Sequence, residues 1–467
     1  MKRKSSAISE NAIVRKSTIV ISMNQLLTFV LSRQGLIRRS STVHSNLFPL
    51  HATSASTPCL SLSARVDNFQ RDHMARFLTK SRYTPLAYTL LRCMRSTLHV
   101  VPSELYETVT RCYNYEGCSL AIDRVRKFNM PESDYKHLSK HVLDVLTSHG
   151  PMSTPSLTQH FRNMASGKKK STKTVAVTSH TTSGRWSMTQ SNVGIVVQAL
   201  YSECKLFYGL HGAGNGAPSD GSDTPAAAPW RSSTRLYGIA SLDIGEGALP
   251  LTPTPPTSPP AAADHCALMT WYFDMYSPAT LKDYVWWAGK TVTESRRALS
   301  ELLDTGVLVE IEVEKMPYPM YALATHIPAL RQASDSMPVA VRFLPYEDAI
   351  IKAYKETRFR FFHRASDLSL PPCSSSGTNL ECDSAVENLV MVRGEAMPTV
   401  WVDGQIVGKW QWSADTKKTS PGGIVITTLI ELSPAIKARL KDELEIVGEL
   451  LGLDVTKSVE YQCSDNL

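Results

Sequence analysis

The feature that most constrains this chain is an order of elements that occurs twice: three amphipathic helices followed by two strands. The clearer copy spans residues 264–323, where apolar residues recur at helical spacing. Ser277-Pro278 begins its second helix, and Gly306 follows its third. The predicted helices cover 264–275, 280–288 and 291–303, and the predicted hairpin strands cover 307–313 and 319–323. This order is typical of a winged helix.

A second copy is predicted in residues 130–247. A helix starts after Pro131 and is broken at Gly150-Pro151, and a shorter helix follows Ser153. The third helix, 189–202, carries valines and Leu200 at helical spacing and leads into a strand. Upstream, an apolar helix over 23–31 and a strand ending at Pro102 suggest a first, winged-helix-like unit.

The C-terminal third has a different character. Two alternating β segments within 399–410 meet at Asp403-Gly404, which predicts a two-residue hairpin turn. A strand over 424–432 and an amphipathic helix from Ser433-Pro434 to Leu451 follow. The fold class expected is therefore α+β, with tandem winged-helix modules, a C-terminal β-rich element and a terminal helix.

These patterns divide the chain into seven parts. The expected parts are a disordered or targeting tail (1–22), a first winged-helix-like module with the candidate site (23–129), a second module with a low-complexity insert at 211–229 (130–247), a Pro-rich linker (248–263), a third module (264–330), a β-rich region with a terminal helix (331–453), and a second tail (454–467).

The net charge of +7 does not by itself indicate a nucleic-acid partner, because residues 1–50 carry all of it and the remainder sums to zero. Local basic patches must therefore carry any phosphate-binding argument.

No apolar run reaches the length of about 18 residues that a membrane helix needs, so no membrane partner is expected. The nine cysteines include no Cys-x-x-Cys pair, so we expect reduced thiols, an intracellular location and no metal. No phosphate-loop or dinucleotide motif occurs in a suitable context, so no cofactor is expected.

The N-terminus is basic and poor in acidic residues. It fits a plain disordered tail, a mitochondrial transit peptide, or a nuclear signal at Lys2-Arg3-Lys4. We expect a nuclear protein, with the mitochondrion as the alternative, and a monomer.

Four segments occur in order along the chain: Arg95 to Pro102, Tyr276 to Thr280 leading into Tyr284 to Gly289, Phe343-Leu344-Pro345 with Glu347-Asp348, and Pro398 to Gly404 with Val407 to Trp410. Taken together and in this order, they resemble the winged-helix proteins that include the AlkZ and YcaQ DNA glycosylases. The resemblance implies a DNA-binding surface and removal of alkylated bases, including bulky and crosslinked ones, from double-stranded DNA.

The family's catalytic motif, Gln-x-Gln or Gln-x-Asp, lies shortly before a Leu-x-x-x-Ala-Arg-type segment. Here His51-Ala52-Thr53 occupies that place, ahead of Leu60 to Arg65. In an extended segment residues i and i+2 share a face, so both side chains can act in one site. His51 would accept a proton from water and Thr53 would orient that water. A DNA-contact role without chemistry and a purely structural role remain alternatives.

Other residues are candidates for DNA contact. Arg65 and Arg95 could each pair with a phosphate or with a buried carboxylate, and His99 is more often structural. The full set predicted to bind DNA is Arg65, Arg95, Lys168, Lys169, Lys170, Arg358 and Arg360. The lysines could instead form a solvated loop or a localisation signal, and the last two arginines could belong to a core element. Trp286-Trp287 is predicted to pack in the core.

The function expected is therefore that of a metal-free, monofunctional DNA glycosylase acting on alkylated bases. The alternative is a winged-helix DNA-binding or regulatory protein without catalysis.

Overall fold

The computed structural model is a mixed assembly of helices and strands, as the α+β expectation required. It describes residues 19–54, 56–69, 88–115, 118–165, 190–210, 235–239, 258–336, 339–362, 387, 390–413, 423–428, 431–451, 453, 455 and 459–463. The predicted insert at 211–229, most of the linker at 248–263, and Lys168, Lys169 and Lys170 lie outside these residues.

The element order predicted for 264–330 is present. Thr280 and Thr291 each accept a hydrogen bond from the backbone N–H three residues later, so both helices start where a side chain satisfies a free amide. Gly289 ends the second helix in the left-handed conformation. The elements are α9 (Ala262–Tyr276), α10 (Leu281–Ala288), α11 (Val292–Asp304), β8 (Leu308–Val313), β9 (Met320–Leu323) and α12 (Ile327–Gln332).

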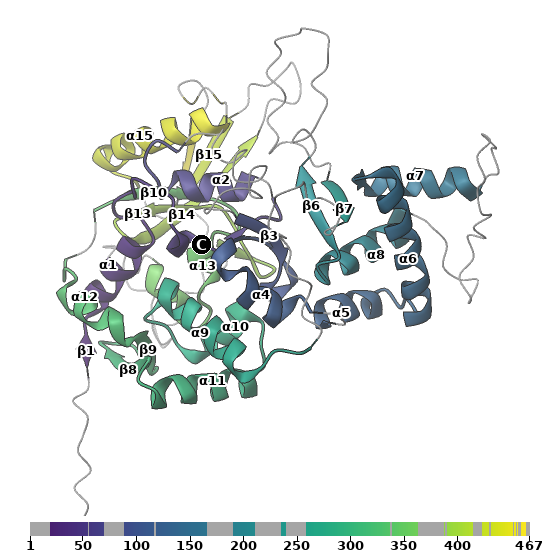
Figure 1. Ribbon diagram of the computed structural model, residues 1–467. Helices are drawn as coiled ribbons and strands as arrows, with labels where there is room; N and C mark the ends of the chain where they lie inside the picture. Colours follow the sequence, from purple (N-terminus) through teal and green to yellow (C-terminus); the bar gives the residue numbers. More distant parts are fainter. Residues whose placement is uncertain are drawn as a thin grey trace, which may run out of the picture.

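The order predicted for 130–247 is also present, with an added short strand. Its elements are α6 (Glu132–His149), β5 (Met152–Ser153), α7 (Thr154–Ala165), α8 (Gln190–Ser202), β6 (Leu206–Leu210) and β7 (Arg235–Ile239). The three strands pair in the order β5-β7-β6. Figure 1 shows these helices at one end of the molecule, beside the rest of the fold.

The first two described elements of the chain, β1 (Val20–Ile21) and α1 (Met23–Arg33), pack against elements of the 264–330 unit. Strand β1 pairs in parallel with β8, and the following helix α1 contacts α12. This region therefore does not fold as a separate unit. The remaining elements are η1 (Ser45–Leu47), β2 (Leu50–His51), α2 (Ser56–Ser63), β3 (Tyr88–Arg92), η2 (Met94–Ser96), β4 (Leu98–Pro102), η3 (Ser103–Leu105), α4 (Tyr106–Tyr113) and α5 (Ser119–Lys127).

A five-stranded sheet, in the order β10-β13-β14-β15-β16, forms the C-terminal part. Asp403 and Gly404 both have positive φ, as the predicted two-residue turn requires. Strand β16 pairs in parallel with β15 and lies within 454–467, so the prediction of a tail there was wrong over this segment. The elements are β10 (Val341–Leu344), α13 (Ala349–Lys352), η6 (Arg358–Phe361), β11 (Met391–Val392), β12 (Glu395–Ala396), β13 (Thr399–Val402), β14 (Gln405–Ser413), β15 (Gly423–Thr428), α15 (Pro434–Leu451) and β16 (Val459–Cys463).

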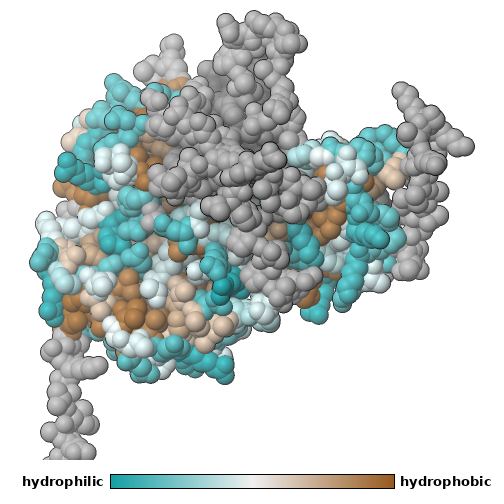
Figure 2. All heavy atoms as spheres, viewed as in Figure 1, coloured by the Kyte–Doolittle hydropathy of each residue, from teal (hydrophilic) through white to brown (hydrophobic). Residues whose placement is uncertain are grey.

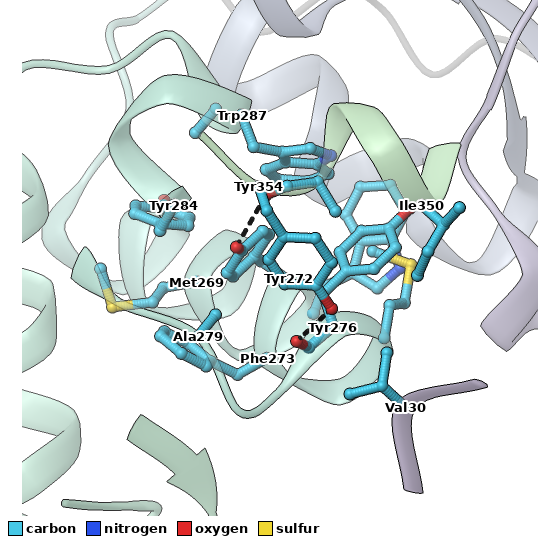
Figure 3. Close-up of a cluster of buried hydrophobic side chains, with 14 of the residues drawn as sticks. Val30, Met269, Tyr272, Phe273, Tyr276, Ala279, Tyr284, Trp287, Ile350 and Tyr354 are labelled. Atoms are coloured by element: carbon cyan, nitrogen blue, oxygen red, sulfur yellow. Dashed lines mark hydrogen bonds between the residues drawn. The ribbon is translucent and has the colours of Figure 1, made fainter. Parts of the chain in front are cut away.

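Buried aromatic rings join α9 and α10 to the segment around α13. The Tyr272 hydroxyl donates to the Ala353 carbonyl at 2.9 Å, and the Tyr354 hydroxyl donates to the Tyr276 carbonyl at 2.7 Å. Figure 3 shows these tyrosines packed with Trp287, and with Val30 of α1 at the edge of the cluster. Burying both the ring and a bonded hydroxyl makes such residues strong anchors.

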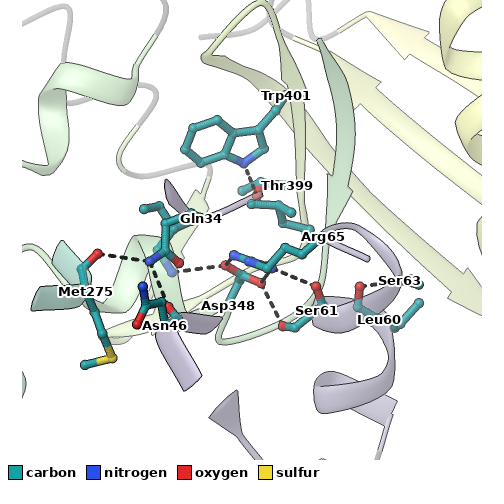
Figure 4. A network of polar contacts seen from close by, with 12 residues as sticks. Gln34, Asn46, Leu60, Ser61, Ser63, Arg65, Met275, Asp348, Thr399 and Trp401 are labelled. Atoms are coloured by element: carbon teal, nitrogen blue, oxygen red, sulfur yellow. Dashed lines mark hydrogen bonds and ion pairs between the residues drawn. The ribbon is translucent and has the colours of Figure 1, made fainter. Parts of the chain in front are cut away.

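A fully buried ion pair connects α2 to the start of α13. The Arg65 guanidinium donates to both carboxylate oxygens of Asp348, at 2.9 and 2.6 Å, and the Ser61 hydroxyl donates to one of them at 2.8 Å (Figure 4). Asp348 also accepts from the Ile350 N–H and so caps α13. Neither side chain of the pair is exposed to solvent.

The outer faces of α6 and α11 are largely hydrophilic (Figure 2). Among the described residues, no helix combines the length and apolar character that crossing a bilayer requires. Six of the described cysteines are buried.

Replacing Arg65 should test how much this ion pair stabilises the fold. Arg65→Met leaves the Asp348 carboxylate buried without its cation, so we expect the free energy of unfolding to fall by about 3–5 kcal/mol. Chemical denaturation followed by circular dichroism measures the loss. The double variant Arg65→Met/Asp348→Asn should recover part of it, because the uncompensated charge is gone. A double variant less stable than Arg65→Met would contradict this account.

Candidate active site

His51 and Thr53 lie close together, as their spacing predicts. His51 ends β2, which pairs with β4, and it lies directly opposite His99. The Thr53 hydroxyl oxygen is 3.2 Å from His51 Nε2. His51 is buried, with 6% of its surface exposed, whereas Thr53 is exposed. The pair therefore has a buried end at the imidazole and an end open to solvent at the hydroxyl.

A third residue, Glu347, faces His51 from another part of the chain. Its Oε2 is 3.7 Å from His51 Nε2. Its Oε1 accepts hydrogen bonds from the Lys352 ammonium at 2.9 Å and from the Ala396 N–H at 2.6 Å. The carboxylate is buried, and one oxygen is fully engaged while the other points to the histidine. Glu347 is not among the residues predicted for the site, although it lies in the Leu-Pro-containing segment of the family resemblance.

Local backbone geometry places Glu347 there. Glu347 has a positive φ of 58°, uncommon for a residue with a side chain, and its N–H donates to the Ala396 carbonyl at 2.8 Å. The next residue, Asp348, is held by Arg65. The hydrogen bond to Ala396 and the ion pair at Asp348 therefore hold Glu347 in one orientation despite its strained backbone.

Burial lowers the pKa of His51 to about 4, an effect that the nearby cations Lys352 and Arg95 increase and Glu347 opposes. His51 is therefore neutral at pH 7 and carries one ring proton. The two oxygens near the ring, from Thr53 and Glu347, both lie at Nε2. A carboxylate on that side favours the tautomer with the proton on Nε2, so the ring is placed to donate rather than to accept.

His99 supports this arrangement from the adjacent strand. Its Nδ1 lies 3.1 Å from the Thr97 carbonyl oxygen, and its ring meets the His51 ring edge-on at 5.5 Å between centroids. Burial lowers its pKa well below 6.5. A neutral, internally bonded histidine fits the structural role expected for it.

Three cations surround the indole of Trp286. The side-chain cation of Arg95 lies 4.0 Å from a ring centroid of this indole, and those of Lys352 and Arg358 lie 5.1 Å away. Burial lowers the pKa of Lys352 to about 8, although Glu347 opposes the shift. The prediction of core packing is confirmed for Trp287, which is 5% exposed, but Trp286 is only partly buried and faces these cations.

The predicted DNA contacts of three arginines do not fit their surroundings in the structure. Arg65 is fully buried against Asp348, the carboxylate alternative left open by the sequence. Arg360 is 3% exposed, donates to the Pro278 carbonyl and lies over Tyr354. Arg358 is equally buried and donates to the Ile351 carbonyl, as the core alternative requires. The basic-aromatic spacing of 358–364 could not show that these side chains turn inward.

Arg95, in contrast, is exposed and lies at this site. Its place beside Trp286 and Lys352 is compatible with the predicted phosphate contact. The remaining predicted contacts, Lys168, Lys169 and Lys170, belong to the part of the chain that the structure does not describe.

Comparisons with known proteins identify a family and a solved structure of similar fold. The family model for DNA glycosylase AlkZ-like proteins matches residues 45–450. The solved structure of Streptomyces sahachiroi DNA glycosylase AlkZ is similar with a TM-score of 0.61 and 17% sequence identity, covering 96% of this chain and 100% of that one. No curated protein matches. The structural likeness concerns the fold, and the family match spans both His51 and Glu347, so this chain belongs to the AlkZ-like DNA glycosylase family.

Proposed function

We propose that this protein is a monofunctional DNA glycosylase that hydrolyses the N-glycosidic bond of alkylated bases in double-stranded DNA. The observation that carries the proposal is the meeting of three polar groups, His51 Nε2, Thr53 Oγ1 and Glu347 Oε2, in one partly buried place. A water between the histidine and the carboxylate would contact both, since 3.7 Å is too long for a direct hydrogen bond.

The chemistry needs a nucleophilic water and negative charge beside the sugar. An alkylated purine is already cationic and leaves with the electrons of the C1′–N bond without needing a strong acid. The sugar gains positive charge as the bond breaks, and the Glu347 carboxylate stabilises that charge. Water then adds to C1′ and gives its proton to Glu347 Oε2, while His51 and Thr53 orient the water. The products are a free base and an abasic site.

This mechanism differs from the one expected from the sequence in which residue accepts the proton of the water. His51 was expected to accept the proton. A pKa of about 4 makes it a weak base, and the adjacent carboxylate favours a proton on Nε2. Glu347 therefore takes the role of base, and His51 becomes a residue that orients water.

We infer that DNA is held by tandem winged helices formed by α6–β7 and α9–β9, and that the protein acts as a monomer. The observed element orders and strand pairings support the winged-helix part of this inference. Bulky or crosslinked lesions remain within the proposed substrate range. The alternative is a DNA-binding protein without catalysis, which the membership of a glycosylase family disfavours.

Substitution of the three converging residues should lower base release without abolishing DNA binding. With duplex DNA containing N7-methylguanine, we expect about 100-fold slower release for Glu347→Gln and a smaller loss for His51→Ala and Thr53→Val. Abasic sites are counted by alkaline strand cleavage. Glu445→Gln, at an exposed position on α15 and outside the two proposed winged helices, is the matched control and should act like wild type. Absence of release by the wild type, despite tight binding, would exclude the enzyme and favour the alternative.

The rate of release should depend on pH through Lys352 and His51. Protonated Lys352 holds Glu347, and its pKa of about 8 means that this cation is lost as the pH rises through 8, so the rate should fall there. On the acid side, neutral His51 should persist down to about pH 5, because its pKa is about 4. Rate–pH profiles measure both limbs.

Lys352→Arg serves as the variant control for the alkaline limb. Arginine stays protonated throughout this range, so the limb should disappear in a folded, active variant. An unchanged limb would rule out Lys352 as its source, and an acid inflection near pH 6.5 would rule out the assigned state of His51.

We also propose a nuclear location, with the mitochondrion as the alternative, from the basic segment Lys2-Arg3-Lys4. A fluorescent fusion should concentrate in the nucleus and lose that preference when residues 1–18, which precede strand β1, are removed. Mitochondrial accumulation of the full-length fusion would support the alternative.

A further inference from the structure

We propose that Arg95, stacked on Trp286, binds a backbone phosphate next to the nucleotide whose base is removed. This inference rests on the proposed function, because it assigns a phosphate site beside the same group of residues. The Arg95 side-chain cation lies 4.0 Å from a Trp286 ring centroid. A guanidinium stacked on a ring by its face keeps its N–H groups free at the edge, where they can bind two phosphate oxygens.

The charges around Trp286 are not balanced. Lys352 is paired with Glu347 at 2.9 Å, and Arg358 makes a longer contact of 3.5 Å with Glu387. Arg95 has no carboxylate within 4 Å among the described residues. One exposed cation therefore has no carboxylate in direct contact at a place where three cations meet, and its nearest electrostatic partner, Glu347, is already paired with Lys352.

Arg358 adds a second, independent observation. It is 3% exposed, yet its Nη2 has no hydrogen-bond acceptor in the described part of the chain. A buried donor without an acceptor is costly. Burial lowers the pKa of Arg358, and the nearby Arg95 cation lowers it further. An anion bound on Arg95 would offset the repulsion between these two guanidiniums.

The backbone holds Arg95 rigidly in this place. Arg95 and Ser96 both have positive φ, 54° and 61°, in the turn η2 before strand β4. A Cβ added at Gly289 would lie only 3.3 Å from the Arg95 backbone nitrogen, so the end of α10 packs closely against this turn. A cation held by a packed turn and an aromatic ring loses little conformational freedom on binding.

The position relates the phosphate to the reacting nucleotide. Lys352 contacts Glu347 and also lies 5.1 Å from Trp286, so it lies between the two groups. Both Arg95 and Lys352 are close enough to influence the pKa of His51. A phosphate on Arg95 would therefore belong to the nucleotide at the His51 and Glu347 site, or to its immediate neighbour.

The test measures DNA binding and not base release, so that it separates this inference from the proposed chemistry. The probe is a duplex with a tetrahydrofuran abasic analogue, compared with duplexes in which a single flanking phosphate is a neutral methylphosphonate. Wild type, Arg95→Gln and the control Arg331→Gln are titrated over a range of salt concentrations. Arg331 is exposed on α12 and has no carboxylate partner among the described residues.

We expect Arg95→Gln to bind about tenfold more weakly, with a salt dependence reduced by about one phosphate contact, whereas Arg331→Gln binds like wild type. At one position the methylphosphonate should weaken wild type similarly and leave Arg95→Gln unchanged. If every methylphosphonate affects wild type and Arg95→Gln equally, the phosphate site is overturned while DNA binding stands. If wild type does not bind the duplex, both this inference and the proposed function fail.

Discussion

The buried ion pair of Arg65 and Asp348 is the interaction on which the rest of the site depends. Taking both charges out of water is expensive, and the cost is offset because both carboxylate oxygens receive guanidinium N–H groups and one also receives the Ser61 hydroxyl. The pair joins Arg65, two residues after the end of α2 and fourteen residues after His51, to the residue next to Glu347. It therefore fixes the distance between the two halves of the candidate active site.

Burial and nearby charges give His51 and Glu347 different protonation behaviour in this site. The imidazole of His51 is kept neutral because it is buried beside cations, and the carboxylate of Glu347 keeps its charge partner in Lys352. A weak base and a carboxylate side by side can orient and deprotonate a water without a metal. The same cations extend the site towards Trp286, where the field suits an anionic backbone.

Sequence patterns predicted much of the fold because helices, caps and turns depend on interactions between residues that are close in the sequence. Helix spacing, threonine caps and the Asp403-Gly404 turn depend on residues a few positions apart, and the corresponding elements are present. The same holds for His51 and Thr53, which are two residues apart. Most of the wrong predictions concern whether a side chain points inward or outward: Arg65, Arg358 and Arg360 are buried, and Trp286 is only partly buried. The other wrong prediction is the tail at 459–463, which forms a strand paired with β15.

Patterns in the sequence are enough to predict the α+β class, the repeated order of helices and hairpins, and two polar residues, His51 and Thr53, at the place that the resemblance gives to the family's catalytic motif. Only the tertiary structure decided that Glu347 completes that site and that Arg95 is the predicted arginine left exposed beside it. The physical reason is distance along the chain. His51, Arg95 and the segment that carries both Glu347 and Lys352 are far apart in the sequence. The burial, ion pairs and stacking that define their roles arise only when these segments pack together.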